Sequence, residues 1–278
     1  MNKESRVFDC FPFFNELDVL DMRLNILNDQ VDYFVLVESK RSHQKKPKQL
    51  YYEENKHLFE KFNKKIIHIV KPDEPDNFGS EVTPGVAMQE EIDHRNCIRH
   101  LPNYIELKET DVFVISDVDE IPKLTSDMLT QSRLMLEQLH FVYNFNNIAT
   151  SPLALKEWAG TVIVNYDDFL SEARKWENDT SKPRYKGYFR HGGEGVRRIK
   201  NAGWHLSYFG DEEHIKTKLD NFCHPEVNTQ STNTIKDHIN SGTDFLGWFR
   251  GGTFSQVTDY SVLPEYVLNN KEKYSKFF

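Results

Sequence analysis

The stretch VFVISDVDEIP, residues 112–122, brings four apolar residues in a row directly before a cluster of acidic side chains. A strand that is apolar on both faces is typical of the interior of a parallel sheet covered by helices. Ligands of such sheets bind outside the carboxyl ends of the strands. The sequence therefore predicts a buried strand here, with Asp117, Asp119 and Glu120 at the edge of a ligand crevice.

Strand-like and helix-like segments alternate on the N-terminal side of this stretch. The strand-like segments are rich in β-branched and aromatic residues, and the helix-like ones have apolar residues at helical spacing. We expect strands at 6–11, 32–39, 65–70 and 111–116, and helices at 16–28, 57–62 and 86–101. This order predicts an α/β fold, a mostly parallel sheet with helices on both faces.

The pattern becomes irregular after residue 122. Here we expect a helix at 126–139, strands at 139–146, 160–166 and 202–210, a helix at 211–222 and a closing helix after Pro264. Residues 171–200 are polar and basic and contain a glycine-rich loop. No repeat or linker composition divides the chain, so we expect a single domain, 1–278, with an irregular C-terminal half.

Composition excludes some classes of protein. The 278 residues carry 35 basic and 43 acidic side chains, a net charge of −8, which argues against a nucleic-acid binder. Cys10, Cys97 and Cys223 lie too far apart for a thiolate zinc site, and they suit a reducing compartment. The sequence has no apolar run long enough for a signal peptide or a membrane span, so we expect a cytoplasmic location.

Asp117 and Asp119 form an Asp-x-Asp pair after the predicted strand. Oxygen ligands of this kind suit Mg²⁺ or Mn²⁺, which share the rest of their coordination shell with water and substrate phosphates. The same string also resembles the signature of haloacid-dehalogenase phosphatases, in which Asp117 would be the nucleophile. That signature usually follows the first strand of the sheet, whereas three strands are predicted before this one.

Several segments in order resemble glycosyltransferase family 17: FDCFPFFNELDVLDMRLNIL, VDYFVLVES, ISDVDEIP and GWHLSYFG. The resemblance implies a GT-A-like, Rossmann-related fold. Its nucleotide-sugar half would be 1–122 and its acceptor-side half 123–278. It also implies a divalent metal, Mn²⁺ or Mg²⁺, and inverting transfer from a UDP-sugar, with UDP-N-acetylglucosamine as first candidate. The animal enzymes of the family have a membrane anchor that this sequence does not show, so the glycan or glycoconjugate acceptor stays open. An inactive glycan- or nucleotide-binding module is a further alternative.

The resemblance also implies roles for individual residues. Asp119 would bind the metal directly, and Asp117 would contact the ribose or the metal through water. His205 would complete the metal shell, unless it is a core histidine. Inverting transfer needs a general base. Glu213 is the first candidate for it, and the alternatives are Glu194 and Asp211; as a first-turn acid, Glu213 would instead favour the helix dipole.

The remaining candidates would contact the donor or the acceptor. They are Asp9 and Phe11 at the end of the first strand, Glu38 and Ser39 at the end of the second, Arg95 for the diphosphate, and Trp158 for stacking on acceptor sugar.

Overall fold

The computed structural model describes residues 5–73, 82–150, 157–178, 196–227, 230–246 and 254–278. No helix among these residues is long and apolar enough to cross a membrane. Cys10, Cys97 and Cys223 are buried, and none of them is in a disulfide.

The N-terminal half contains the predicted parallel sheet. Its four strands pair side by side in the order β3-β2-β1-β4, and every pairing is parallel. Their bounds are β1 Val7–Phe13, β2 Tyr33–Glu38, β3 Ile66–Val70 and β4 Val112–Ile115. Helices connect them: α1 Leu17–Leu27, α2 Tyr51–Asn55 and α3 Pro84–Asn96, with 3₁₀ helices at Lys56–Phe62 and Cys97–Asn103.

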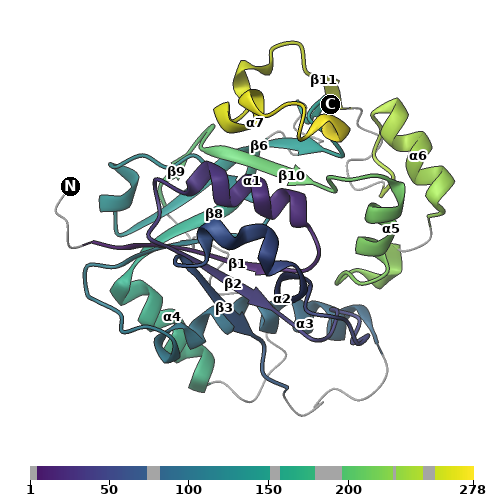
Figure 1. The fold of residues 1–278 in the computed structure, drawn as a ribbon. Helices are drawn as coiled ribbons and strands as arrows, with labels where there is room; N and C mark the ends of the chain where they lie inside the picture. The colour runs from purple at the N-terminus through teal and green to yellow at the C-terminus, as the bar shows by residue number, and fades with distance from the viewer. Residues whose placement is uncertain (1–4, 74–81, 151–156, 179–195, 228–229, 247–253) are drawn as a thin grey trace.

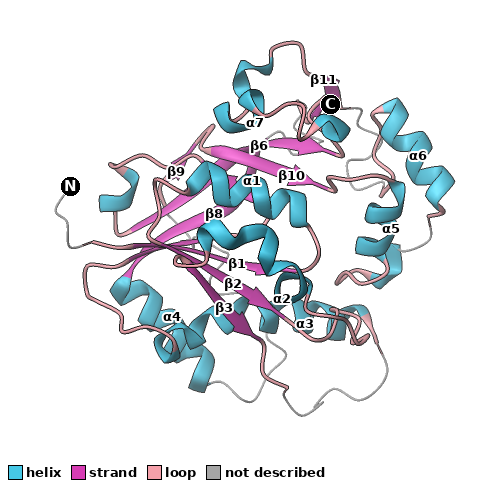
Figure 2. Cartoon of the chain, viewed as in Figure 1, coloured by secondary structure: helices cyan, strands magenta, loops and turns pink. Residues whose placement is uncertain are grey.

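Helices cover both faces of this sheet, as predicted (Figure 2). Alternate residues of β1 belong to two different cores: Phe11 and Phe13 pack with α1 on one face, and Phe8 and Cys10 pack with the 3₁₀ helix Cys97–Asn103 and with α4 (Tyr166–Asn178) on the other. This explains why the strands are apolar throughout, because neither face meets water.

The expectation of a mostly parallel sheet is wrong for the C-terminal half, where the sheet is mixed. Strand β8 (Glu157–Asn165) lies antiparallel between β4 and β6 (Arg133–Val142), and β6 also pairs in parallel with β10 (Gly203–Ser207). Short strands complete the sheet: β5 Glu120–Pro122, β7 Asn147–Ile148, β9 Arg198–Ile199 and β11 Ser255–Gln256.

The predicted helix at 126–139 is also wrong, because most of this segment is strand β6 and only Met128–Thr130 form a 3₁₀ turn. The segment RLMLEQLHFV is rich in good helix formers such as Leu, Met, Glu and Gln. It is a strand because β8, β9 and β10 pair with it and most of its apolar side chains are buried. Tertiary pairing therefore overrides the local preference.

Three of the described α-helices were not predicted: α2, α4 and α6 (Thr232–Ser241). Helix α4 is mostly polar, and Phe169 and Ala173 pack it against the sheet. Helix α6 has ordinary end signals, since Ser231 caps its first turn and Gly242 ends it with a φ of 61°.

Strand β1 also runs past Pro12, where we expected it to end. Strand β4 pairs with β1 only as far as Cys10, so Pro12 needs no backbone donor on that side.

A small third core lies beyond the end of β10 (Figure 1). It joins α5 (Glu212–Leu219) and α6 to the end of β6 through Val142, Ile215, Leu219 and Ile235. The chain then closes with α7 (Glu265–Asn269), whose Val267 belongs to the same core as α1. Helix α5 is thereby fixed beside the carboxyl ends of β1, β4 and β10.

Candidate functional site

A cavity of about 570 Å³ opens at this edge of the sheet. Its wall comes from the segments that follow β1, β2 and β4 and from α3, β8, β10 and α5. The volume and position are typical of a small-molecule site in an α/β protein. Five residues predicted for the site lie in the wall: Arg95, Asp117, Asp119, Trp158 and His205.

The turn that carries the two aspartates is held from beneath by Arg23, a fully buried residue of α1. Its Nη1 donates to the carbonyl oxygens of Asp117, Val118 and Glu120 at 2.8, 3.2 and 3.0 Å. Its Nη2 donates to Ser116 Oγ at 2.7 Å. One guanidinium therefore fixes the backbone from which both aspartate side chains extend.

Asp9 and Phe11, predicted to contact the nucleotide base, lie beneath the cavity and not in its wall. Both carboxylate oxygens of Asp9 accept from Arg23, at 2.8 and 2.6 Å, and the Arg23 guanidinium lies 4.5 Å from the centre of the Phe11 ring. The structure thus gives them contacts that support Arg23.

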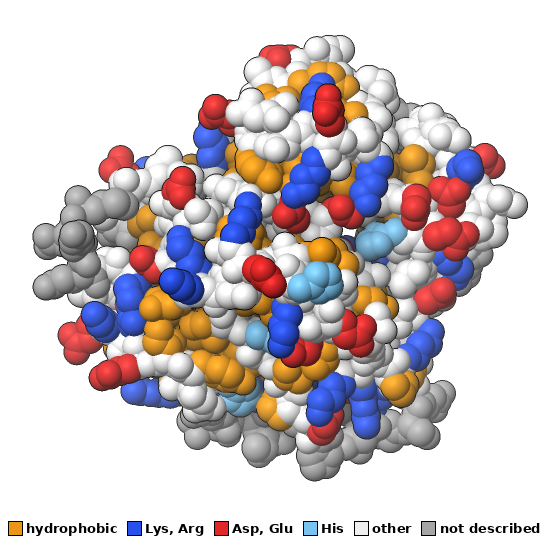
Figure 3. Space-filling view, in the orientation of Figure 1, with side chains coloured by type: hydrophobic (Ala, Val, Ile, Leu, Met, Phe, Trp, Pro, Cys, Tyr) orange, Lys and Arg blue, Asp and Glu red, His pale blue; other side chains and the backbone are white. Residues whose placement is uncertain are grey.

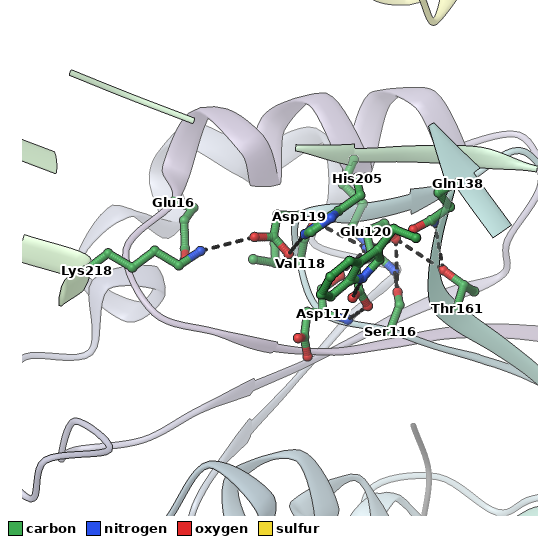
Figure 4. Close-up of polar contacts among 12 residues, drawn as sticks. Glu16, Ser116, Asp117, Val118, Asp119, Glu120, Gln138, Thr161, His205 and Lys218 are labelled. Carbon is green, nitrogen blue, oxygen red and sulfur yellow. Dashed lines mark hydrogen bonds and ion pairs between the residues drawn. The ribbon is translucent and has the colours of Figure 1, made fainter. Parts of the chain in front are cut away.

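Glu120, the third acid of the cluster, points into the protein. Its Oε2 accepts from the Asp117 backbone N–H at 2.7 Å (Figure 4). Its Oε1 accepts from Trp158 Nε1 at 2.6 Å. A Cβ at Gly160 would lie 2.5 Å from Glu120 Cδ, so the glycine makes room for this arrangement. Glu120 therefore ties the turn to Trp158 of β8.

Asp117 is paired with Arg95 of α3. Arg95 Nε and Nη2 donate to the two carboxylate oxygens of Asp117, each at 2.7 Å, and Nη2 also donates to Glu91 at 2.9 Å. Such a bidentate ion pair fixes the orientation of both side chains. The sequence placed Arg95 near the diphosphate but gave no sign that it would bind Asp117.

Asp119 lies between two groups, Lys218 and His205. Lys218 Nζ donates to its Oδ2 at 3.1 Å, and His205 Nε2 lies 4.0 Å from its Oδ1 (Figure 4). Burial raises the pKa of the Asp119 carboxyl; the Lys218 ammonium opposes that shift, and the Asp117 and Glu16 carboxylates add to it. Within the described ranges, no three Asp, Glu, His or Cys side chains form a ready metal site.

His205 is held in a stack of rings. Its ring centre lies 4.4 Å from that of Trp158 and 4.6 Å from that of His140, with interplanar angles of 25° and 22°. It is 5% exposed yet contributes to the cavity wall. It therefore combines the surroundings of a core histidine with the position expected of a ligand.

Glu38 and Ser39 lie outside the wall, although β2 ends at the cavity. Glu38 is fully buried with His68 Nε2 at 3.1 Å from its Oε2, and Ser39 Oγ accepts from the Arg41 backbone N–H at 3.1 Å. Arg41 and the residues after it form this part of the wall instead.

The candidates for the general base are not in the described wall. Asp211 caps α5 by accepting from the His214 backbone N–H at 2.8 Å, and Glu213 is exposed on the same helix. Glu194 lies outside the described residues. The assignment of the base stays a prediction.

Lys218 and Glu16 were not predicted for the site. Lys218 Nζ also lies 3.6 Å from Glu16 Oε1, and both residues contribute to the wall. A sequence signal for Lys218 existed, because it shares the helical face of Ile215, Leu219 and Phe222. A lysine on the apolar face of a helix needs a buried partner.

The whole sequence matches a known family, although no individual curated protein matches it. Residues 1–278 match the description Glycosyltransferase family 17. This match favours sugar transfer over the phosphatase chemistry in which Asp117 is a nucleophile. It also confirms the resemblance found in the sequence: the chain belongs to glycosyltransferase family 17 and is, at that level, a glycosyltransferase.

Proposed function

We propose that the protein transfers a sugar, with N-acetylglucosamine as first candidate, from a UDP donor to a hydroxyl group of a glycan acceptor, with inversion and with a divalent cation. The observation that carries the proposal is the placement of Asp117, Asp119 and His205 in the wall of one cavity at the carboxyl edge of the sheet. Family membership supports the transfer, and the position supports a nucleotide ligand.

The residues present fit a Mn²⁺ or Mg²⁺ ion. Asp119 would offer it a carboxylate oxygen and His205 an imidazole nitrogen, and these two atoms lie 4.0 Å apart. Arg95 engages both oxygens of Asp117, so we expect Asp117 to act through water or the ribose. When bound, the cation would neutralise charge on the leaving diphosphate.

The protein's own residues would orient the reactants. In the transfer, the acceptor oxygen bonds to C1 of the sugar while the bond from C1 to the diphosphate oxygen breaks. The electron pair leaves with UDP, and the hydroxyl proton passes to a carboxylate base. Trp158 is fixed by its bond to Glu120 and by its stack on His205, so it can present a rigid ring edge to the acceptor.

Titration calorimetry with UDP, with and without Mn²⁺, tests the donor and the cation. We expect UDP binding that requires Mn²⁺, and release of UDP from UDP-N-acetylglucosamine when a glycan acceptor is supplied. Asp119→Asn should lower turnover about a hundredfold or more, because the cation that would stabilise the leaving diphosphate loses a charged ligand.

Asp18→Asn is the matched control, since Asp18 lies outside the cavity wall and pairs with Lys276 at 2.6 Å. Absence of UDP binding with either metal would overturn the proposal. UDP binding without turnover on any glycan would assign the protein to the binding modules instead.

A further inference from the structure

Lys218 is a cation built into the centre of the site. Its ammonium group lies 3.1 Å from Asp119 and 3.6 Å from Glu16, and its side chain is 20% exposed (Figure 4). Two carboxylates beside one ammonium favour its charged form. Lys218 is therefore a permanent positive charge beside the carboxylate that would bind metal.

The charges in the described wall of the cavity balance. Each aspartate of the pair has its own cation, Arg95 for Asp117 and Lys218 for Asp119. The wall holds four anions and four cations, so its formal charge is zero with neutral histidines: Glu16, Glu91, Asp117, Asp119, Arg41, Lys48, Arg95 and Lys218. Lys and Arg also alternate with Asp and Glu over the face in Figure 3. A free divalent cation would therefore enter a site whose carboxylates are already neutralised.

We propose that Lys218 couples the binding of the divalent cation to the binding of the nucleotide diphosphate. A cation on Asp119 would add two positive charges close to the Lys218 ammonium, and like charges at this separation repel. A diphosphate brings negative oxygens that can accept from Lys218 as it leaves Asp119. The two ligands therefore bind together, and each binds weakly alone. This inference rests on the proposed function, because it takes UDP as the nucleotide.

The structure allows Lys218 to change partner while its helix stays in place. Ile215 and Leu219, fully buried in the third core, fix α5 on both sides of Lys218. The ammonium also lies 5.4 Å from the centre of the Tyr208 ring, a cation–π contact that does not involve Asp119. A shift of the flexible lysine side chain is sufficient.

Calorimetry on Lys218→Gln tests the coupling. Three titrations are compared with the wild type: Mn²⁺ alone, UDP alone, and UDP at saturating Mn²⁺. We expect Mn²⁺ alone to bind about tenfold more tightly to the variant, and UDP with Mn²⁺ to bind about tenfold more weakly. UDP alone should bind the variant and the wild type alike, so the factor by which Mn²⁺ strengthens UDP binding should fall by about tenfold, which lies within the usual range of coupling between sites.

Lys216→Gln is the matched control, because Lys216 lies on the same helix, outside the wall, and pairs with Asp220 at 2.8 Å. It should keep the wild-type coupling. Lys218→Arg, which retains the charge, should also keep the wild-type coupling. Circular dichroism shows whether the Gln variant folds, and if it does not, the Arg variant tests the proposal.

These titrations distinguish failure of the proposed function from failure of the role of Lys218. If the wild type shows no UDP binding with Mn²⁺, the proposed function fails. If the wild type binds both ligands cooperatively and folded Lys218→Gln has the same coupling, or if Lys218→Arg loses it, only the role of Lys218 fails.

Discussion

Arg23 shows how one buried side chain can organise a site without touching its ligand. It is 0% exposed, and its charge is matched by Asp9 at 2.6 Å. Its Nη1 donates to the carbonyl oxygens of Asp117, Val118 and Glu120. A buried arginine with all these bonds contributes position more than net stability, because desolvation offsets much of its attraction.

Arg23→Gln should lower the free energy of unfolding by about 3–5 kcal/mol, because Asp9 is left as a buried, unpaired charge. It should also abolish Mn²⁺-dependent UDP binding at temperatures where the variant is folded, because the turn loses its support. Urea unfolding and calorimetry measure the two effects.

Arg6→Gln is the comparison for Arg23→Gln. Arg6 pairs with Asp111 at the opposite end of β1, at 2.6 Å, with 19% of its side chain exposed. The Arg6→Gln variant should have a lower free energy of unfolding but the same affinity for UDP as the wild type. Unchanged UDP affinity in Arg23→Gln would refute the positioning role.

Helix α5 shows how an element links local sequence to the site. Asp211 caps its first turn, and Ile215 and Leu219 anchor it in the third core. Lys218 follows on the same face and reaches Asp119. The helix has only eight residues, so its stability depends on its cap and on packing more than on its own propensity.

Asp211→Ala should cost about 1 kcal/mol of unfolding free energy, because the His214 backbone N–H loses its acceptor. Asp211→Ser keeps a good cap and removes the carboxylate, so it should keep both stability and turnover. The alternative role of Asp211 as the base requires turnover to collapse in the serine variant. Ser231→Ala, which removes the matching cap of α6, should cost similar stability and leave UDP binding unchanged.

At the scale of the whole molecule, the cavity forms where the segment after β2 meets α3. His94 of α3 has Nε2 3.0 Å from the Val37 carbonyl oxygen, so this nitrogen donates, and Nδ1 accepts from His43 Nε2 at 3.4 Å. Burial lowers the pKa of both histidines, and the pair is neutral in the folded protein.

This pair predicts a loss of stability in mild acid. Each histidine has a lower pKa in the folded protein than in the unfolded chain. Its contribution to the free energy of unfolding is therefore complete above the unfolded pKa of about 6.5. As the pH falls below that value, the unfolded chain takes up protons that the folded protein does not. The free energy of unfolding therefore falls by up to about 1.4 kcal/mol per pH unit for each histidine.

Urea unfolding between pH 8 and pH 5.5 measures this slope. His94→Gln should have a shallower slope than the wild type, whereas His57→Gln, which replaces an exposed histidine, should not. Equal slopes in the wild type and His94→Gln would contradict the assignment.

The sequence predicted those parts of the site that depend on the order of strands and helices along the chain. Asp117 and Asp119 follow an apolar strand, and the alternation of strands and helices places that strand's end at the ligand edge. The pairings of Asp117 with Arg95 and of Asp119 with Lys218 join residues 22 and 99 positions apart. No spacing rule covers such distances, so they were not predicted.

The sequence by itself determined the parallel half of the sheet, the apolar strand 112–115 and the acidic turn after it, because these follow from periodicity and from the direction of parallel strands. Tertiary structure alone decided that residues 133–138 belong to strand β6, since β8 and β9 supply the pairing that overrides the helix-forming residues there. It also decided which cation faces each aspartate, because that depends on how α3 and α5 pack around the cavity.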